Sequence, residues 1–274
     1  MTFRNNLSEE LNREGNEHFS RGYYTEAYTC YAKALEYDRL TGDQRALVAT
    51  LGNLGNICAV SGRRDSAQAH YHEVLELQKL LGDEKGIGTT LANLGNLRAD
   101  AGEWDRAQAY YLEALDLMTK THDEPAQAVL YSDLGLVARE TGRFAEAIQF
   151  YERSLGLMRR LSNLSGVADA WRMIGRTFLI QKRYDEAIAC CQTSQAIAER
   201  LRDELRTGGA RYVLAQCYEE MGRLQDAANL LEQVVRMDRK YCLPKLEENT
   251  QRLKALRVRL ANPYRLQPGR GMET

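Results

Sequence analysis

The stretch Leu51-Gly-Asn-Leu-Gly-Asn-Ile-Cys-Ala-Val-Ser-Gly62 decides the fold, because the chain returns to it at Leu91-Ala-Asn-Leu-Gly-Asn-Leu-Arg-Ala-Asp-Ala-Gly102. The second copy begins 40 residues after the first, and weaker copies lie at the same interval before and after. Self-similarity at a fixed period of roughly 20–50 residues is typical of arrays in which each unit packs only against its neighbours. The sequence therefore predicts a repeat array rather than a fold with one central core.

Four columns of residues recur every 40 positions through six units, without insertion or deletion. Their members are Gly15, Gly55, Gly95, Gly135, Gly175 and Ala215; Gly22, Gly62, Gly102, Gly142, Lys182 and Gly222; Ala27, Ala67, Ala107, Ala147, Ala187 and Ala227; and Tyr31, Tyr71, Tyr111, Tyr151, Cys191 and Leu231. Glycine inside a helix costs about 1 kcal/mol relative to alanine, so the first column predicts a close approach by a neighbouring helix. The second column predicts helix ends, where glycine supplies a left-handed residue. The small residues of the third column allow tight packing.

Each unit is predicted to form two antiparallel helices, which we name helix A and helix B. Helix B of the second unit is expected from about Asp65 to Leu81, with Gly82 ending it and Asp83 capping the next helix A. The start of helix B is expected to be capped by Thr25, Asp65, Asp105 and Asp185 in their respective units. The predicted fold is all-α: a right-handed α-solenoid of six antiparallel helix pairs plus a C-terminal capping helix.

We expect a single solenoid domain over residues 1–262. The repeats are expected at about 8–42, 43–82, 83–122, 123–162, 163–202 and 203–242, followed by the capping helix at 243–262. That helix should place apolar residues against the last repeat and charged residues toward water. Because residues 263–274 include Pro263, Pro268, Gly269 and Gly271, we expect a disordered tail there.

Composition argues against several classes of function. The net charge is −1 and no basic block is present, which argues against a nucleic-acid or anionic-membrane binder. No apolar run approaches the ~18 residues that a membrane span needs, and residues 1–13 lack the apolar core of a signal peptide. The six cysteines have no metal-site or disulfide spacing, so we expect free thiols, a cytoplasmic location, no metal and no cofactor. The adjacent Cys190 and Cys191 are more typical of buried helical thiols than of a redox pair.

The fifth unit carries Trp171, Ile174, Gly175 and Phe178 on helix A and Ala187 on helix B. With this pattern the chain resembles the tetratricopeptide repeat family over residues 8–240. The common repeat of that family is about 34 residues long, whereas this one is 40. The longer variant resembles the Leu-Gly-Asn repeat adaptors of cell polarity, the kinesin light chains and the bacterial peptide-sensing repeat proteins. This resemblance implies binding of peptides or protein segments.

The sequence shows no catalytic constellation. Of the four histidines, His70 and His72 are two residues apart and so point to different sides of a helix. We find no HExxH motif, no phosphate-binding glycine loop and no nucleophile elbow. We therefore expect no enzymatic activity.

The resemblance implies that helix A lines the concave side of the solenoid, so its inward residues are the candidates for recognition. The predicted partner-binding residues are Asn12, Arg13, Asn16, Asn53, Asn56, Asn93, Asn96, Asp133, Leu136, Arg172 and Arg176, and Met173, Tyr212, Val213 and Gln216 extend the same face. A row of asparagines offers donors and acceptors to a peptide backbone. We expect the double change Asn56→Ala with Asn96→Ala to weaken binding without altering the melting curve.

Two of the arginines suggest a more specific chemistry. Arg172 and Arg176 are four residues apart on one helix face, where they could hold a carboxylate or phosphate. They could instead pair with Asp133, Asp169 or Glu140 of adjacent helices, while Asp133 could take a basic side chain.

The terminal-carboxylate clamp of chaperone-tail co-chaperones with this fold would fall on Asn12, Asn16, Asn53, Thr89 and Asn93. Two asparagines match, but both lysines and the arginine of the clamp are missing, so we do not predict that function. The predicted function is a scaffold or adaptor that holds a partner peptide or helix in the concave groove. A peptide-responsive regulatory sensor and a self-assembling scaffold are the alternatives.

Overall fold

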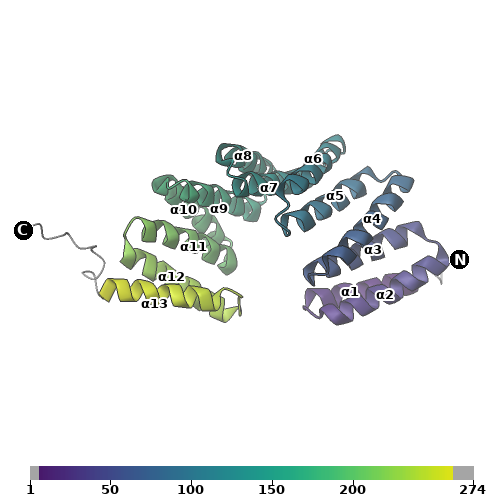
Figure 1. Ribbon diagram of the computed structural model, residues 1–274, viewed down its shortest axis with the longest axis horizontal. Helices are drawn as coiled ribbons and strands as arrows, with labels where there is room; N and C mark the ends of the chain where they lie inside the picture. The colour runs from purple at the N-terminus through teal and green to yellow at the C-terminus, as the bar shows by residue number, and fades with distance from the viewer. Residues whose placement is uncertain (1–5, 262–274) are drawn as a thin grey trace, which may run out of the picture. The chain divides into compact units, whose positions relative to one another are not determined.

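The computed structural model describes residues 6–261, and these residues form thirteen α-helices and no strand (Figure 1). The helices are α1 (Asn6–Ser20), α2 (Tyr24–Thr41), α3 (Gln44–Val60), α4 (Arg64–Leu81), α5 (Glu84–Ala99), α6 (Trp104–Lys120), α7 (Glu124–Glu140), α8 (Phe144–Arg160), α9 (Leu164–Ile180), α10 (Tyr184–Arg200), α11 (Glu204–Glu220), α12 (Leu224–Lys240) and α13 (Leu246–Ala261). The predicted tail at 263–274 lies outside the described residues.

The helices belong to two compact units, the first ending at Thr141 and the second beginning at Gly142. In the first unit α1 packs on α2, α3 on α4 and α5 on α6, and each pair contacts the next. In the second unit α9 packs on α10 and α11 on α12, and α13 packs on α12. This succession of helix pairs with a final helix confirms the predicted fold class. The expectation of one domain over 1–262 stays a prediction.

The glycine and tyrosine columns pack against each other. A Cβ atom added to Gly95 would lie 2.5 Å from Cε1 of Tyr111, and added Cβ atoms on Gly15 and Gly55 would overlap the rings of Tyr31 and Tyr71 in the same way. The three tyrosines are almost fully buried. The predicted close approach is therefore confirmed in these repeats, and the group that approaches the glycine is an aromatic ring.

The predicted helix ends are also confirmed. Glycines of the second column, such as Gly62 with φ of 73°, adopt the left-handed conformation. The same conformation at non-glycine residues occurs at His122, Ser162, Lys182, Arg202 and Cys242. Helix A begins after a side-chain cap in five repeats, at Asp43, Asp83, Asp123, Asn163 and Asp203.

The predicted caps of helix B are wrong. Helix α4 begins at Arg64, so Asp65 lies inside its first turn, and the N-cap residue Arg63 makes no side-chain capping bond. Thr25, Asp105 and Asp185 likewise lie inside the first turns of α2, α6 and α10. Acidic side chains there still face the positive end of the helix dipole, which stabilises the first turn.

The capping helix α13 takes the place of a further helix A. Its Leu253 and Leu256 are buried in one cluster with residues of α12. Its Asn249 donates from Nδ2 to Oδ2 of Asp238 on α12, at 2.7 Å. At the other end of the chain Thr50 of α3 donates to Asp38 of α2 at 2.6 Å, so both contacts join a helix B to the helix that follows it.

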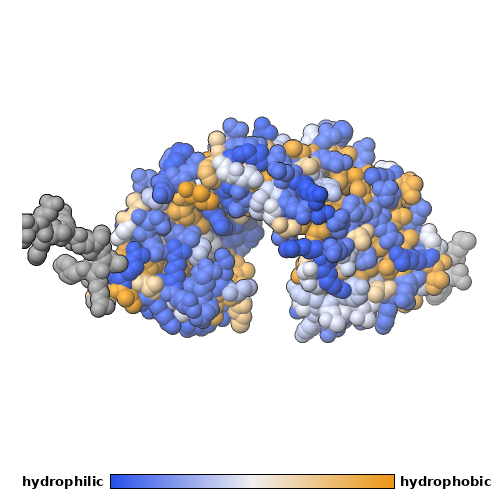
Figure 2. Space-filling model, viewed as in Figure 1, coloured by the Kyte–Doolittle hydropathy of each residue, from blue (hydrophilic) through white to orange (hydrophobic). Residues whose placement is uncertain are grey.

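The molecular surface is mostly hydrophilic in the view of Figure 2, with hydrophobic residues scattered among polar ones. Among residues 6–261, no helix has both the length and the apolar character needed to cross a membrane.

Candidate partner-binding site

In the first three repeats, the asparagine that follows the glycine of the first column accepts a hydrogen bond from a buried tyrosine. The hydroxyl of Tyr71 donates to Oδ1 of Asn56 at 2.8 Å. The hydroxyl of Tyr111 donates in the same way to Asn96 at 2.7 Å, and the first repeat has the equivalent bond between Tyr31 and Asn16. Burial raises the pKa of Tyr71 to about 12, so the phenol stays protonated and continues to donate. These asparagines are exposed and face solvent, but they also contribute to the fold.

Asn12 and Asn53, which the sequence predicted to share a face, are in contact. Nδ2 of Asn53 on α3 donates to Oδ1 of Asn12 on α1 at 2.9 Å. Nδ2 of Asn12 donates to Oγ1 of Thr50 at 2.7 Å, and Thr50 donates to the buried Asp38. The chain of hydrogen bonds joins three helices. Asn12 therefore has a structural role, while Arg13 is exposed on α1 and Asn93 is half-buried on α5.

Asp133 on α7 is half-buried, and burial raises the pKa of its carboxyl group to about 7. Its charge also raises the pKa of Tyr111, although burial is the larger cause for that phenol. At neutral pH a carboxyl group with this pKa is divided between its two protonation states. Its attraction for a basic side chain of a partner would therefore depend on pH. Leu136 is half-buried on the same helix.

In the second unit, Arg172 is part of a charged network that joins two A helices. Its Nη2 lies 3.3 Å from Oδ1 of Asp169, one turn earlier on α9. Oδ2 of the same carboxylate accepts from Nε of Arg206 on α11 at 2.9 Å. Arg172 therefore pairs with Asp169, one of the acids considered in the sequence analysis, but this acid lies on its own helix and not on an adjacent one. Arg206 also pairs with Asp203, at 2.5 Å, so two guanidinium groups are balanced by two carboxylates.

A pocket of about 340 Å³ lies between α9, α11, the end of α12 and the start of α13, and we name it the A-face pocket. Five residues that the sequence placed on the recognition face line it: Arg172, Arg176, Tyr212, Val213 and Gln216. The structure therefore brings this part of the predicted site together.

The A-face pocket also contains residues that the sequence did not single out. Lys245 comes from the turn before α13, Asp238 from α12 and Asn249 from α13. The sequence could have indicated Asp238, because it lies 200 residues after Asp38 and so occupies the same position of the 40-residue repeat. Asn249 is harder to identify, because it lies one residue before the repeat position that Thr50 and Thr90 occupy.

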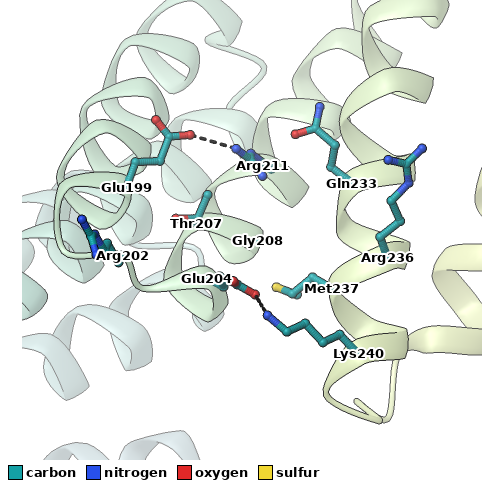
Figure 3. A pocket seen from close by; sticks show the side chains of 10 residues that line it. All are labelled: Glu199, Arg202, Glu204, Thr207, Gly208, Arg211, Gln233, Arg236, Met237 and Lys240. Carbon is teal, nitrogen blue, oxygen red and sulfur yellow. Dashed lines mark hydrogen bonds and ion pairs between the residues drawn. The ribbon is translucent and has the colours of Figure 1, made fainter.

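A second pocket, of about 600 Å³, lies between α10, α11 and α12 (Figure 3). Two ion pairs occupy its lining: Arg211 lies 2.9 Å from Glu199, and Lys240 lies 2.6 Å from Glu204. It contains none of the predicted recognition residues. The smaller A-face pocket, which contains five of them, is therefore the candidate site.

Possible metal ligands gather at one place in the described part of the chain. Ligand atoms of Glu14, His18 and Cys30 lie within 4.8 Å of one another between α1 and α2. Burial raises the pKa of the Cys30 thiol and the charge of Glu14 raises it further, which opposes the thiolate that a metal needs. Cys190 and Cys191 are unpaired and buried, as expected, and burial raises the pKa of Cys190 to about 11.

Comparison with known proteins agrees with the repeat pattern. The tetratricopeptide repeat family matches residues 86–160 and 166–240, more than half of the chain. No curated protein matches the sequence. BtubC (BKLC) from P. vanneervenii is 18% identical with a TM-score of 0.60, and the match covers 100% of this chain and 98% of that one.

Two further solved structures share the fold. A Rap protein complexed with competence and sporulation factor is 14% identical, with a TM-score of 0.66 and coverage of 92% and 75%. A signal transduction ATPase from Pyrococcus horikoshii with a tetratricopeptide repeat sensor is 14% identical, with a TM-score of 0.75 and coverage of 90% and 38%. These likenesses concern the fold alone. With the family match and the helix pairs described above, the chain belongs to the tetratricopeptide repeat family.

Proposed function

We propose that this protein is a non-enzymatic interaction scaffold that holds a segment of a partner protein against its A helices. The observation that carries the proposal is the A-face pocket. There Arg172 and Arg176 of α9 meet Tyr212 and Val213 of α11 around a cavity of about 340 Å³. Ligand pockets typically occupy ~300–1,000 Å³ and combine apolar walls with a few polar groups.

The family supports the proposal, because tetratricopeptide repeats generally serve as a protein-interaction fold. The Rap structure was determined with competence and sporulation factor bound. Packed helices form such a binding face before the partner arrives, so little ordering entropy is lost on binding. A cytoplasmic setting is part of the proposal, and the unpaired cysteines are consistent with it.

A regulatory sensor is the second candidate function. It is favoured by the bound factor of the Rap protein and by the repeat sensor of the Pyrococcus horikoshii protein. A sensor should change its dimensions when a ligand binds, and a passive scaffold should not. Small-angle scattering of the full chain with and without a selected peptide separates the two functions, because only the sensor predicts a smaller radius of gyration.

The scaffold proposal is tested by panning a displayed random-peptide library against the full chain. Gln216→Trp would fill the A-face pocket, whereas Gln233→Trp places the same bulk in the pocket of Figure 3. We expect selected peptides to bind Gln216→Trp at least tenfold more weakly and to bind Gln233→Trp normally. Matching circular dichroism melts would confirm that both variants fold. The proposal fails if panning enriches no peptide, or if Gln233→Trp alone loses binding.

A further inference from the structure

We propose that the first repeat binds a zinc ion between α1 and α2, through the carboxylate of Glu14, the imidazole of His18 and the thiolate of Cys30. This site belongs to the first unit, whereas the A-face pocket belongs to the second. The proposal therefore goes beyond the scaffold function and does not depend on it. It departs from the sequence-based expectation of no metal.

The three side chains have nearly the spacing of a metal site. Glu14 and His18 are four residues apart on α1 and share a face, with Oε1 of Glu14 lying 3.7 Å from Nε2 of His18. Ligand atoms of all three residues, including Cys30 on α2, lie within 4.8 Å of one another. Zinc binds nitrogen and oxygen at ~2.0–2.2 Å and sulfur at ~2.3 Å, so its tetrahedral ligands lie roughly 3.3–3.7 Å apart. The pair on α1 already has this spacing, and the third ligand needs to approach by only about 1 Å.

The imidazole of His18 makes no hydrogen bond with residues 6–261. Its Nδ1 atom is buried without a partner, and the 3.7 Å between Nε2 and Glu14 exceeds hydrogen-bond range. The ring packs against Tyr23 instead, with 6.2 Å between the ring centroids. Buried polar atoms without partners are rare in proteins, and a bound ion is one of the few explanations. The distance between Glu14 and His18 is thus too long for a hydrogen bond but suits two ligands of one ion.

The repeat itself requires none of the three residues. In the other five repeats the position of Glu14 is occupied by a buried Leu54, Leu94, Leu134, Ile174 or Leu214. The second repeat keeps two ligand types, with Cys58 at the position of His18 and His70 at that of Cys30, but it lacks the carboxylate. The complete set occurs only in the first repeat. Exposure of the first helix accounts for a polar residue at Glu14, but not for a histidine and a cysteine within ligand distance of it.

The charges around the site favour a divalent cation. Glu10 and Glu17 lie one turn before and after Glu14 on the same exposed face of α1. In the metal-free protein, burial and the charge of Glu14 raise the pKa of the Cys30 thiol, while Lys33 lowers it. A zinc ion between the two groups removes their repulsion and stabilises the thiolate. The thiol releases one proton to solvent as the ion binds, so the affinity should rise with pH.

The ligand set selects zinc over the other common divalent ions. A thiolate and an imidazole suit zinc, whereas magnesium and calcium prefer oxygen ligands alone. The cysteine is 9% exposed, and the side chains of His18 and Glu14 are 30% and 60% exposed, so the site opens to solvent on the side of the glutamate. Three protein ligands leave one position of a tetrahedral zinc ion for a water molecule.

The test uses Co²⁺ as a coloured substitute for zinc in the full chain. The protein is treated with a chelator and a reductant, so that bound metal is removed and the thiols stay free, and is then titrated with Co²⁺. A thiolate bound to Co²⁺ gives a charge-transfer absorption in the near ultraviolet that carboxylate and imidazole ligands do not give. We expect this absorption to saturate at one ion per chain and to disappear when Zn²⁺ displaces the cobalt. Its absence would overturn the proposal.

Two matched pairs of variants locate the site. Cys30→Ala should abolish the thiolate absorption, and Cys242→Ala, at the exposed thiol, should keep it. Glu14→Gln should weaken Zn²⁺ binding at least tenfold, and Glu10→Gln, one turn earlier on α1, should leave it unchanged. Circular dichroism melts report whether each variant folds, and the two exposed glutamate positions decide the question if Cys30→Ala does not. The opposite pattern for the cysteines, or equal loss in the two glutamine variants, would overturn the assignment.

Discussion

Replacing Asn96 with alanine should destabilise the first unit. Oδ1 of Asn96 accepts the hydroxyl of Tyr111 at 2.7 Å. Tyr111 is only 2% exposed, and its ring packs where a Cβ on Gly95 would lie, so the hydroxyl has little freedom to find another partner. The sequence-based prediction that asparagine changes of this kind leave the melting curve unaltered therefore needs revision.

The size of the effect follows from the burial of the donor. A typical hydrogen bond contributes ~0.5–1.5 kcal/mol, and a buried donor left without an acceptor costs ~1–3 kcal/mol. The bond between Tyr111 and Asn96 is only partly buried, so water can replace some of it. We expect Asn96→Ala to cost about 1–2 kcal/mol, which lowers the melting temperature by roughly 2–8 °C in a chain of this size.

A double-mutant cycle isolates the bond. Tyr111→Phe removes the donor, so adding Asn96→Ala to it should cost less than Asn96→Ala alone, with a coupling energy of about 1 kcal/mol. Urea unfolding is followed by the fluorescence of Trp104 on α6, in a Trp171→Phe background that removes the signal from the second unit.

Asn93→Ala on the same helix is the matched control. The side chain of Asn93 makes no hydrogen bond to another residue between 6 and 261, so the cost should stay within about 0.5 kcal/mol. The structural role of Asn96 is refuted if Asn96→Ala and Asn93→Ala unfold at the same urea concentration. It is also refuted if the free-energy costs of Asn96→Ala and Tyr111→Phe simply add in the double mutant.

Three further predictions follow from burial. Gly55→Ala should cost about 1–3 kcal/mol, because the added Cβ overlaps the Tyr71 ring, and an unchanged thermal melt would contradict this packing. Asp133 keeps its proton up to about pH 7 in the folded state but loses it above ~4 when unfolded, so stability should fall as the pH rises through this window. Asp133→Asn should accordingly stabilise the protein more at pH 8 than at pH 4, and equal effects in urea unfolding at both pH values would argue against the raised pKa. The exposed Cys242 should react at once with a thiol reagent, and the buried Cys191 only on unfolding; mass spectrometry of the labelled peptides reports the order.

The 40-residue period was sufficient to predict the repeat fold. Helix ends and close helix packing each require particular residue types at particular positions, and these requirements are visible in the sequence. Helix B of the second unit was expected from about Asp65 to Leu81, and α4 spans Arg64–Leu81. The one-residue error at its start matters physically, since it moves Asp65 from a capping position into the first turn. The residue that caps a helix depends on backbone geometry at its first turn, which a column of residue types does not specify.

The role of Asn56 was not predictable from its own helix, because its partner Tyr71 lies 15 residues later on the next one. The sequence nevertheless indicates that the asparagine and the tyrosine are partners, because the two tend to be replaced together. In the fifth and sixth repeats Arg176 and Gln216 replace the asparagine, and Cys191 and Leu231 replace the tyrosine. The fourth repeat is an exception, since Leu136 accompanies Tyr151.

In the second unit, several residues that the sequence predicted to bind a partner lie together in the structure. Arg172, Arg176 and Tyr212 were identified from their place on helix A, and they do line one pocket. Lys245 and Asn249 were missed because α13 was interpreted only as a cap, and because the shift of one residue takes Asn249 out of the repeat register.

Hydrogen exchange of the full chain, with and without a peptide selected by panning, tests most directly whether the A helices of the second unit form the binding face. We expect slower exchange in α9, α11 and the first turns of α13, with α10 and most of α12 unchanged. Protection confined to α10 and α12, or no protection in the second unit, would contradict it.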